Sequence, residues 1–451
     1  MPTVSDNVAE LAANLATARG ADIVDLLNRK KPAFAVKLLQ SLPEEQAVDA
    51  LDQPRLERSA AILSALPPER AARLLDLMSA DRAADAVREM RISVRNDLLA
   101  RVSPETKASL DHLIPYPHGC TGHIMTTEFV AVPGNWTVGE VLDHVRAVEH
   151  ARETVYAIYL LDPQTGVLLR AVALRELISA DPGATVLSVA PARPPMSVTP
   201  ETPEGETVRL ISKYNLLAIP VVDTTRHVIG IVTVDDAVDT LVAQQDAEVQ
   251  NFGGMEALDA PYMHVGFLSM VKKRAGWLCV LFIAEMLTAS AMQSFEDELE
   301  KAVVLALFIP LIMSSGGNSG SQATSLIIRA LALQEVRVRD WWRVLLRELP
   351  SGIALGVILG LLGALRITVW QNLGLFDYGP HWKLVTLTIA SALVCIVTFG
   401  SLVGSLLPFI AKRLGFDPAT ASAPFVATFV DVTGIVIYFT VATLILRGTM
   451  L

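Results

Sequence analysis

Cysteine is scarce in this 451-residue chain, basic residues are outnumbered by acidic ones in residues 1–265, and an apolar N-terminal segment is missing. Only Cys120, Cys279 and Cys395 occur, far apart and two of them in apolar segments, so we expect no disulfide framework. The first ten residues are polar and acidic, without a basic stretch followed by an apolar core. We therefore expect no cleavable signal peptide and a soluble half that remains in the cytosol.

The usual signatures of enzyme sites are missing as well. We find no nucleophile paired with a base, no phosphate-binding glycine loop before a helix, and no zinc-ligand spacing. The run SSGGNSG at 314–320 resembles a phosphate loop only superficially, because it lacks the lysine and lies in an apolar stretch. The sequence therefore predicts a protein that is not an enzyme.

One proline-rich segment, PYPHGCTGH at 115–123, carries His118, Cys120 and His123 close to His112. Imidazole and thiolate are ligands of soft metals, so a metal site is one interpretation of this cluster. The irregular spacing within a proline-rich turn is more typical of an ordinary linker.

The charges that are present are split unevenly. Residues 1–265 carry 23 Lys and Arg against 36 Asp and Glu, a balance of −13, whereas residues 266–451 carry 14 against 11, a balance of +3. An acidic first half disfavours nucleic acid as a partner and favours cations.

Apolar residues dominate the second half. Hydrophobic residues make up 52% of the chain and the mean hydropathy is +0.43, which indicates a membrane protein with a soluble part. Five stretches are long enough to cross the lipid bilayer, at about 275–294, 302–331, 345–370, 384–410 and 424–446. The loops rich in Lys and Arg all fall on one side, so the positive-inside rule predicts a cytosolic N-terminus and a C-terminus outside.

The soluble half reads as three segments. Residues 1–114 are predicted to form an all-α domain of stacked helical hairpins, since Leu42-Pro43 and Leu66-Pro67 recur at a 24-residue spacing. Residues 115–243 alternate short strands and helices, as α/β units do. The runs LAIPVVD and GIVTVDDAVD resemble CBS domains, in two units at about 121–180 and 190–243, and residues 244–270 form a connecting helix. Tandem CBS units of this kind usually bind an adenosine nucleotide such as ATP or a regulatory ion, so the resemblance implies sensing.

The second apolar stretch has a polar middle, SSGGNSGSQ at 314–322. Polar groups at membrane depth are tolerated only where protein or a water-filled cavity satisfies them, and Pro310 removes a further backbone N–H nearby. Close helix packing would explain the glycines and serines. It does not explain Asn318 and Gln322, so we favour the lining of a wet pathway.

Apart from charged residues at the cytosolic ends of the predicted spans, three ionisable residues fall inside them: Glu285, Arg366 and Asp431. A lone charge at mid-bilayer costs about 2.5–3.5 kcal/mol or more, so each is a functional candidate. Arg366 lies near the end of its span and can snorkel to the interface. Glu285 is either a protonated, hydrogen-bonded helix contact or a second cation-facing group. Asp431 is the strongest candidate, because Thr428 and Thr433 offer hydroxyls beside it.

At this point the chain resembles a known family. FIPLIMSSGGNSGSQATSLIIRAL, followed by DPATASAPFVATFVDVTGIVIYF, is similar to the MgtE family of magnesium channels, as is the order of helical N-domain, CBS pair, connecting (plug) helix and a transmembrane pore domain over 271–451. The resemblance implies a homodimer in the bacterial cytoplasmic (inner) membrane, with a Mg²⁺ influx pore between the second and fifth spans. It implies that Asp431 is the Mg²⁺-binding carboxylate of the pore. Together with the polar groups described above, we predict pore metal-binding residues Asp431, Asn318 and Thr428, and pore-lining residues Pro310, Gly317, Gly320, Gln322, Pro424, Thr433 and Glu285.

The resemblance further implies that cytosolic Mg²⁺ closes the pore, bound by a sensor of acidic residues: Asp81, Asp85, Asp236, Asp239 and Glu248. Asn215, Gln244 and Ala247 stand where acidic residues are expected, and fewer carboxylates bind divalent cations more weakly. We therefore predict that Mg²⁺-dependent closure is weakened here.

Two other functions stay open. One is a less selective transporter of divalent cations such as Co²⁺, Mn²⁺ and Ni²⁺, driven by protons through Glu285. The other is a membrane-tethered nucleotide sensor, for which Asp431 and Asn318 would have no use.

Overall fold

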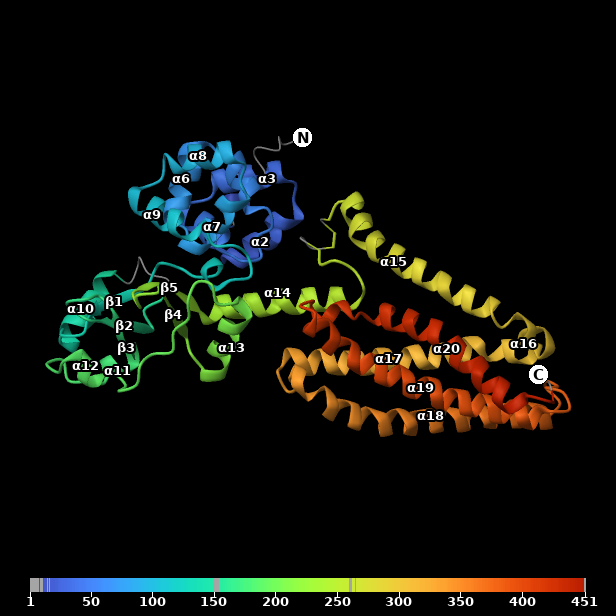
Figure 1. The fold of residues 1–451 in the computed structure, drawn as a ribbon. Helices are drawn as coiled ribbons and strands as arrows, with labels where there is room; N and C mark the ends of the chain where they lie inside the picture. Colours follow the sequence, from blue (N-terminus) through green and yellow to red (C-terminus); the bar gives the residue numbers. More distant parts are fainter. Residues whose placement is uncertain are drawn as a thin grey trace, which may run out of the picture. The chain divides into compact units, whose positions relative to one another are not determined.

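The computed structural model describes residues 8, 11–13, 15, 17–148, 154–258, 262–263 and 265–449. The chain divides into two compact units, Met1–Ala243 and Gln244–Leu451, and is mostly helical (Figure 1). The predicted fold class is confirmed: a helical N-domain, a pair of CBS units and five long apolar helices among the described residues.

The N-domain is built from helical hairpins with the predicted 24-residue period. Its helices are α2 (Gly20–Arg29), α3 (Pro32–Ser41), α4 (Glu44–Leu51), α5 (Ser59–Ala65), α6 (Pro68–Leu77), α7 (Ala80–Glu89), α8 (Ile92–Leu99) and α9 (Pro104–Leu113). The residue that follows the second helix of each hairpin recurs every 24 positions: Leu42, Leu66, Met90 and Ile114. Each helix packs against its counterpart in the next hairpin, such as α4 on α6 and α5 on α7, as stacked repeats do.

The same hydrogen bond recurs with this period. The backbone N–H of Ser79 donates to the Asp52 carboxylate over 3.1 Å, and 24 residues later Ser103 N–H donates to Asp76 over 2.8 Å. These carboxylates satisfy backbone N–H groups at the starts of α7 and α9, which have no partner within the helix.

The two CBS units share one local plan. In the first, β1 (Val130–Pro133) pairs parallel with β2 (Ala157–Leu161), which pairs antiparallel with β3 (Leu168–Ala173). In the second, β4 (Ala218–Val222) pairs antiparallel with β5 (Val228–Thr233), and Val198 bridges Val221 in the parallel sense. The helices are α10 (Val138–Val148), α11 (Leu174–Ile178), α12 (Val186–Val189), α13 (Glu204–Tyr214) and the start of α14 (Val234–Phe252).

The segments that lead into the two CBS units are exchanged between them. Thr121 and Gly122, in the short helix η1 (Thr121–His123) at the start of the first CBS unit, donate backbone hydrogen bonds to Thr202 and Pro200 of the second CBS unit. Conversely, Val138 of the first unit donates to Ala184, which precedes the second. This exchange brings η1 against α14, where an acidic cluster forms.

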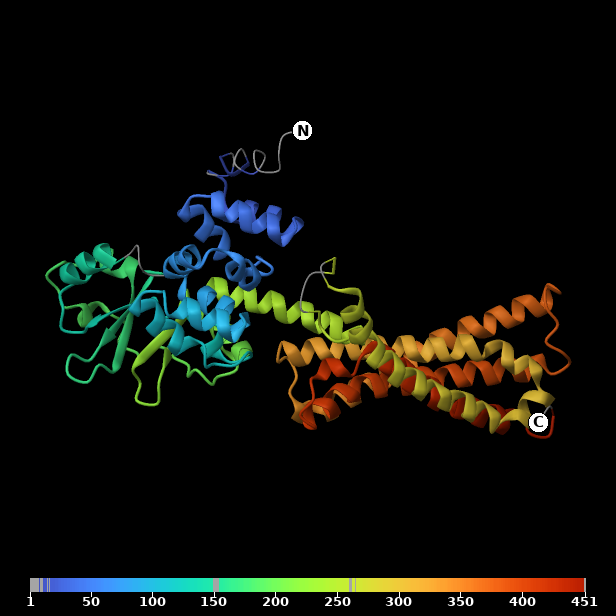
Figure 2. The ribbon, with the colours of Figure 1, turned by 90° about the horizontal axis from the view of Figure 1, so that it is seen from above.

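The second compact unit of the chain, Gln244–Leu451, contains helices that match the predicted spans. They are α15 (Phe267–Gln293), η3 and α17 (Val303–Phe308, Ile309–Ala332), η4 and α18 (Val338–Asp340, Trp341–Asn372), α19 (Trp382–Arg413) and α20 (Ala423–Leu446). The short helices α16 (Glu296–Lys301) and η5 (Pro418–Thr420) lie between spans. Helices α17 to α20 run side by side, and α15 packs on α20 (Figures 1 and 2).

Small residues let these helices pack closely. Along α18, Gly352, Gly356 and Gly360 face the backbone of α19, and Gly316 and Gly320 of α17 face Gly400 and Gly404 of α19. Lipid gives apolar helices no hydrophobic reason to associate, so close backbone approach of this kind is a main source of their packing.

The connecting helix differs from its prediction. We expected a helix over 244–270, but α14 begins at Val234, still within the second CBS unit, and ends at Phe252. Gly253 and Gly254 follow, and Gly254 has a φ of +74°, which glycine adopts readily and which ends the helix.

Candidate functional site

Helix α17 presents two different faces. Ser314, Asn318, Gln322 and Ser325 are exposed within the single chain and recur at the spacing of one helix face. The opposite face, with Gly316, Gly317, Ser319, Gly320 and Thr324, is buried. The polar run therefore packs against neighbouring helices on one face and leaves polar side chains exposed on the other.

The buried face corrects two predictions. Gly320 is enclosed by Val426 and the backbone of Gly400, and Gly317 faces Ala427, so neither glycine belongs to the exposed polar stripe. Their small size allows α17 to approach its neighbours. This burial contradicts their predicted place in the lining of a pathway.

The two prolines also act differently from the prediction. Pro310 and Pro424 each occupy the second position of their helices, α17 and α20. At the start of a helix the missing N–H would have no partner within the helix anyway. These prolines therefore mark where the two helices begin.

Helices α17 and α20 lie against each other with opposite directions. The facing pairs are Met313 with Gly434, Gly316 with Val430, Gly317 with Ala427, and Ser321, whose Oγ donates to the carbonyl of Ala423 over 3.3 Å. This register sets Asp431 level with Ser314 and Ser315, and Thr428 level with Asn318. The predicted ion-binding groups of the two helices thus occupy one short stretch of the bundle.

Asp431 is half-buried in α20, and Thr433, which we expected beside it, makes its hydrogen bond within the helix. The hydroxyl of Thr433 donates to the carbonyl of Phe429 over 2.8 Å, so its proton is used within the helix. Glu285 lies on α15, the helix that packs on α20. Arg366 instead stacks over Trp370 at 4.5 Å, as expected of an anchor near a helix end.

The last turns of α14 and the residues after it contact the region where α20 begins. Asn251 Nδ2 donates to Asp417 Oδ2 over 3.4 Å, and burial together with the charge of Asp417 raises the pKa of Glu248. Trp277 Nε1 donates to Ser422 Oγ over 3.2 Å. The end of α14 and the Trp277 side chain of α15 thus both contact residues at the entry to the fifth span.

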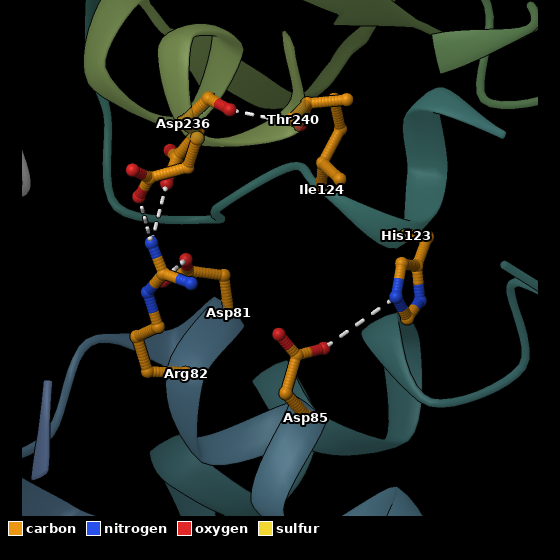
Figure 3. A pocket seen from close by; sticks show the side chains of 8 residues that line it. Asp81, Arg82, Asp85, His123, Ile124, Asp236 and Thr240 are labelled. Atoms are coloured by element: carbon orange, nitrogen blue, oxygen red, sulfur yellow. Dashed lines mark hydrogen bonds and ion pairs between the residues drawn. The ribbon is translucent and has the colours of Figure 1, made fainter. Parts of the chain in front are cut away.

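Four of the five predicted sensor residues line one small pocket in the first unit (Figure 3). It is lined by Asp81, Arg82, Asp85, His123, Ile124, Asp236, Asp239 and Thr240. Asp81 and Asp85 come from α7, and Asp236 and Asp239 from the first turns of α14. The fifth, Glu248, belongs to the second compact unit of the chain, Gln244–Leu451, and does not line this pocket.

Basic groups share the pocket with these acids. Arg82 Nη2 lies 3.2 Å from Asp236 Oδ1 and 3.1 Å from Asp239 Oδ2, and its Nε lies 3.6 Å from Asp81 Oδ2. Burial alone would lower the pKa of the Arg82 guanidinium, but the carboxylates of Asp81, Asp236 and Asp239 outweigh burial and raise it. Arg82 was not among the predicted residues.

Asp85 points to other partners. Its carboxylate accepts a hydrogen bond from Arg88, and His123 Nε2 lies 3.8 Å away. Burial, with the nearby Arg88 charge, lowers the pKa of His123 to about 4, so this imidazole is neutral at physiological pH. Within the part of the chain that the structure describes, no three His, Cys, Asp or Glu side chains converge to hold a metal ion, and the histidine-rich linker forms no such site.

Comparison with known proteins agrees with this architecture. Residues 309–441 match the family described as divalent cation transporter, residues 18–119 match the MgtE intracellular N domain, and residues 186–243 match the CBS domain. The chain is 36% identical to the magnesium transporter MgtE of Thermus thermophilus over 95% of this chain and 93% of that protein. It is 32% identical to the magnesium transporter MgtE of Enterococcus faecalis, over 76% and 73%.

Among solved structures, the chain is similar to the cytosolic domain of the Mg²⁺ channel MgtE in complex with ATP. The likeness has 33% identity and a TM-score of 0.48, and covers 51% of this chain and 93% of that one.

Helical N-domain, CBS units and five apolar helices together define a membrane transport protein with regulatory domains, and not an enzyme. The chain belongs to the MgtE family of magnesium transporters.

Proposed function

We propose that the chain is a Mg²⁺-selective channel whose ion pathway runs between α17 and α20. The observation that carries this proposal is the register of the two helices, which sets Asp431 level with the polar stripe of α17. Mg²⁺ dehydrates reluctantly and is usually held through its waters by one or two carboxylates. Asp431 would supply the carboxylate, and Asn318, Gln322 and Thr428 the polar groups that receive the waters.

A homodimer would complete this pathway. In the single chain the polar stripe of α17 is exposed, yet polar groups at membrane depth need protein or water to satisfy them. Helix α15 is also largely uncovered, because only 6% of its most apolar 18-residue stretch is buried in the single chain. A second copy across a two-fold axis would enclose the stripe and place a second Asp431 opposite the first.

Gating by cytosolic Mg²⁺ would act through α14, which begins at the acidic pocket and ends beside Asp417. Cation binding at the carboxylates of α7 and α14 would fix the first unit, and the far end of the helix would hold the entry to α20. This proposal requires the chain to lie in the bacterial inner membrane, with the N-terminus and both regulatory domains in the cytosol and the C-terminus outside.

Flux through proteoliposomes tests the proposed function. The full chain should admit Mg²⁺ when the membrane potential is inside-negative, in preference to Co²⁺, Mn²⁺ and Ni²⁺, and raising Mg²⁺ on the cytosolic side should reduce the flux only at millimolar concentrations. Closure at submillimolar Mg²⁺ would contradict the weakened sensor, and equal flux of all four cations would contradict selectivity.

A proton-coupled transporter of divalent cations is the second candidate, because α15, which packs on α20, carries the carboxyl group of Glu285 within its span. It requires flux to follow a pH gradient. Binding of an adenosine nucleotide at the CBS pair also stays a prediction, and equilibrium dialysis of the full chain against ATP, with and without Mg²⁺, tests it.

A further inference from the structure

The acidic pocket between α7 and α14 already contains a cation of its own, the guanidinium group of Arg82. Its Nη2 lies within 3.2 Å of carboxylate oxygens from both Asp236 and Asp239 (Figure 3). The Arg82 side chain has 22% of its surface exposed, and those of Asp81, Asp236 and Asp239 have 9%, 12% and 43%, so solvent screens the contacts with Asp81 and Asp236 less than the contact with Asp239.

The carboxylate oxygens of the pocket bind guanidinium and hydroxyl groups and do not converge on one point. Asp236 uses Oδ1 for Arg82 and accepts at Oδ2 from the Thr233 hydroxyl over 2.6 Å. Asp85 is bound by Arg88. Two guanidinium groups thus offset half of the charge of the four carboxylates.

These contacts do not fit a resident Mg²⁺. Mg²⁺ takes six oxygen ligands at about 2.0–2.1 Å in near-ideal octahedral geometry. Here the donors that would face such an ion are spread around a guanidinium, and among the described residues no three acidic, His or Cys side chains converge on one point. A divalent cation can enter only if Arg82 moves out.

We propose that Arg82 is a tethered cation that occupies the divalent-cation site between the N-domain and the second CBS unit. Binding of Mg²⁺ there is an exchange in which the guanidinium leaves as the ion enters. Arg82 therefore sets the affinity of the pocket, and it joins α7 to α14 when Mg²⁺ is absent. The inference rests on the proposed function only for its consequence, a raised Mg²⁺ threshold for closure.

Divalent-cation binding to the full chain in lipid nanodiscs tests the exchange. Mn²⁺ serves as the probe, because it prefers the same oxygen ligands and its free form is measured by electron paramagnetic resonance. Arg82→Gln removes the charge at similar side-chain size and should tighten Mn²⁺ binding by at least about tenfold, which corresponds to about 1.4 kcal/mol. Adding Asp236→Asn to this variant should abolish the gain.

Two further variants separate exchange from general charge. Arg82→Lys keeps the positive charge and should bind Mn²⁺ as the wild-type chain does. Arg73→Gln removes an arginine from an exposed ion pair with Glu44, at 3.3 Å, on the same domain and should also leave binding unchanged. Unaltered binding in Arg82→Gln, an equal gain in Arg73→Gln, or a gain that survives Asp236→Asn would each overturn the proposal.

A second readout needs no bound cation. In EDTA, hydrogen exchange of α7 and of the first turns of α14 should be faster in Arg82→Gln than in the wild-type chain, and Mn²⁺ should restore protection. Equal exchange rates in EDTA would contradict the bridging role. Neither readout depends on conduction, so absence of Mg²⁺ flux in the wild-type chain would refute the channel and leave this inference standing.

Discussion

The hydroxyl oxygens of Ser319 and Ser401 lie 2.7 Å apart in a buried contact between α17 and α19. One turn along, the Thr324 hydroxyl lies 2.8 Å from the carbonyl of Gly404, which helps to fix the same pair of helices. Polar residues of α17 thus hold the bundle together on one side, while Ser314, Asn318 and Gln322 on the other side are exposed within the single chain.

The close approach of α17 and α19 should make Gly404 intolerant of any side chain. A methyl group at Gly404 would overlap the carbonyl oxygen of Gly320, a backbone atom that cannot rotate away. We expect Gly404→Ala to destabilise the membrane domain by about 1–3 kcal/mol or more. Thermal unfolding in detergent, followed by fluorescence-detected gel filtration, measures this. Gly276→Ala is the control, because a methyl group there meets nothing within 4 Å; equal losses in the two variants would contradict the packing account.

Asp52 should make the N-domain less stable as pH rises. Burial is the main cause that raises the pKa of Asp52 from 3.8 to about 6, so its stabilising contribution is complete below pH 3.8 and is lost as pH rises through 6. Asp52→Asn keeps an oxygen that can accept from Ser79 N–H but cannot ionise. At pH 8 its free energy of unfolding should therefore exceed that of the wild-type chain by up to about 3 kcal/mol, with a higher unfolding temperature. At pH 4 the two chains should differ little.

The repeat provides the control for this prediction. Asp76→Asn changes the equivalent hydrogen bond, to Ser103, at an exposed site. Its effect should be small at both pH values. If Asp76→Asn showed the same pH-dependent gain as Asp52→Asn, burial would not be the cause.

Much of the fold could be predicted because it follows from periodic patterns. The 24-residue recurrence of Leu42-Pro43 and Leu66-Pro67 indicated the hairpins, and the apolar runs indicated the spans. The two faces of α17 could not be separated from composition, because glycine and serine suit close packing and a polar lining equally well.

The role of Arg82 also could not be predicted from local sequence. Asp81 and Asp85 are four residues apart and so share one face of a helix, which suggests a carboxylate pair. Arg82 follows Asp81 directly, and adjacent residues of a helix do not share a face, so the sequence does not place Arg82 with this pair. Only the approach of α14 brings Asp236 and Asp239 to the side chain between them. A contact between residues more than 150 positions apart leaves no local pattern.

Glu285 separates a channel from a coupled transporter. The account predicts that Mg²⁺ flux follows membrane potential and is unchanged by a pH gradient, in both the wild-type chain and Glu285→Gln. Proteoliposomes with independently set potential and pH provide the measurement. Flux that needs a pH gradient in the wild-type chain and loses that need in Glu285→Gln would favour the transporter.

Closure should depend on the indole N–H of Trp277. Trp277→Phe keeps a ring against Phe425 but loses the hydrogen bond to Ser422 at the start of α20. A single hydrogen bond contributes about 0.5–1.5 kcal/mol, so half-closure should need roughly two- to tenfold more cytosolic Mg²⁺. Trp342→Phe, at an exposed tryptophan near the start of α18, should leave the closing concentration unchanged. An identical closing concentration in Trp277→Phe and the wild-type chain would exclude this contact from the gate.

The central claim is that Asp431 binds the permeating ion between α17 and α20. Mg²⁺ flux into liposomes should be compared for the wild-type chain, Asp431→Ala and Asp377→Ala, a carboxylate in the loop between α18 and α19. The account predicts that Asp431→Ala loses Mg²⁺ conduction or its selectivity over other divalent cations, while Asp377→Ala conducts as the wild-type chain does. Wild-type conduction and selectivity in Asp431→Ala would show that the ion site lies elsewhere.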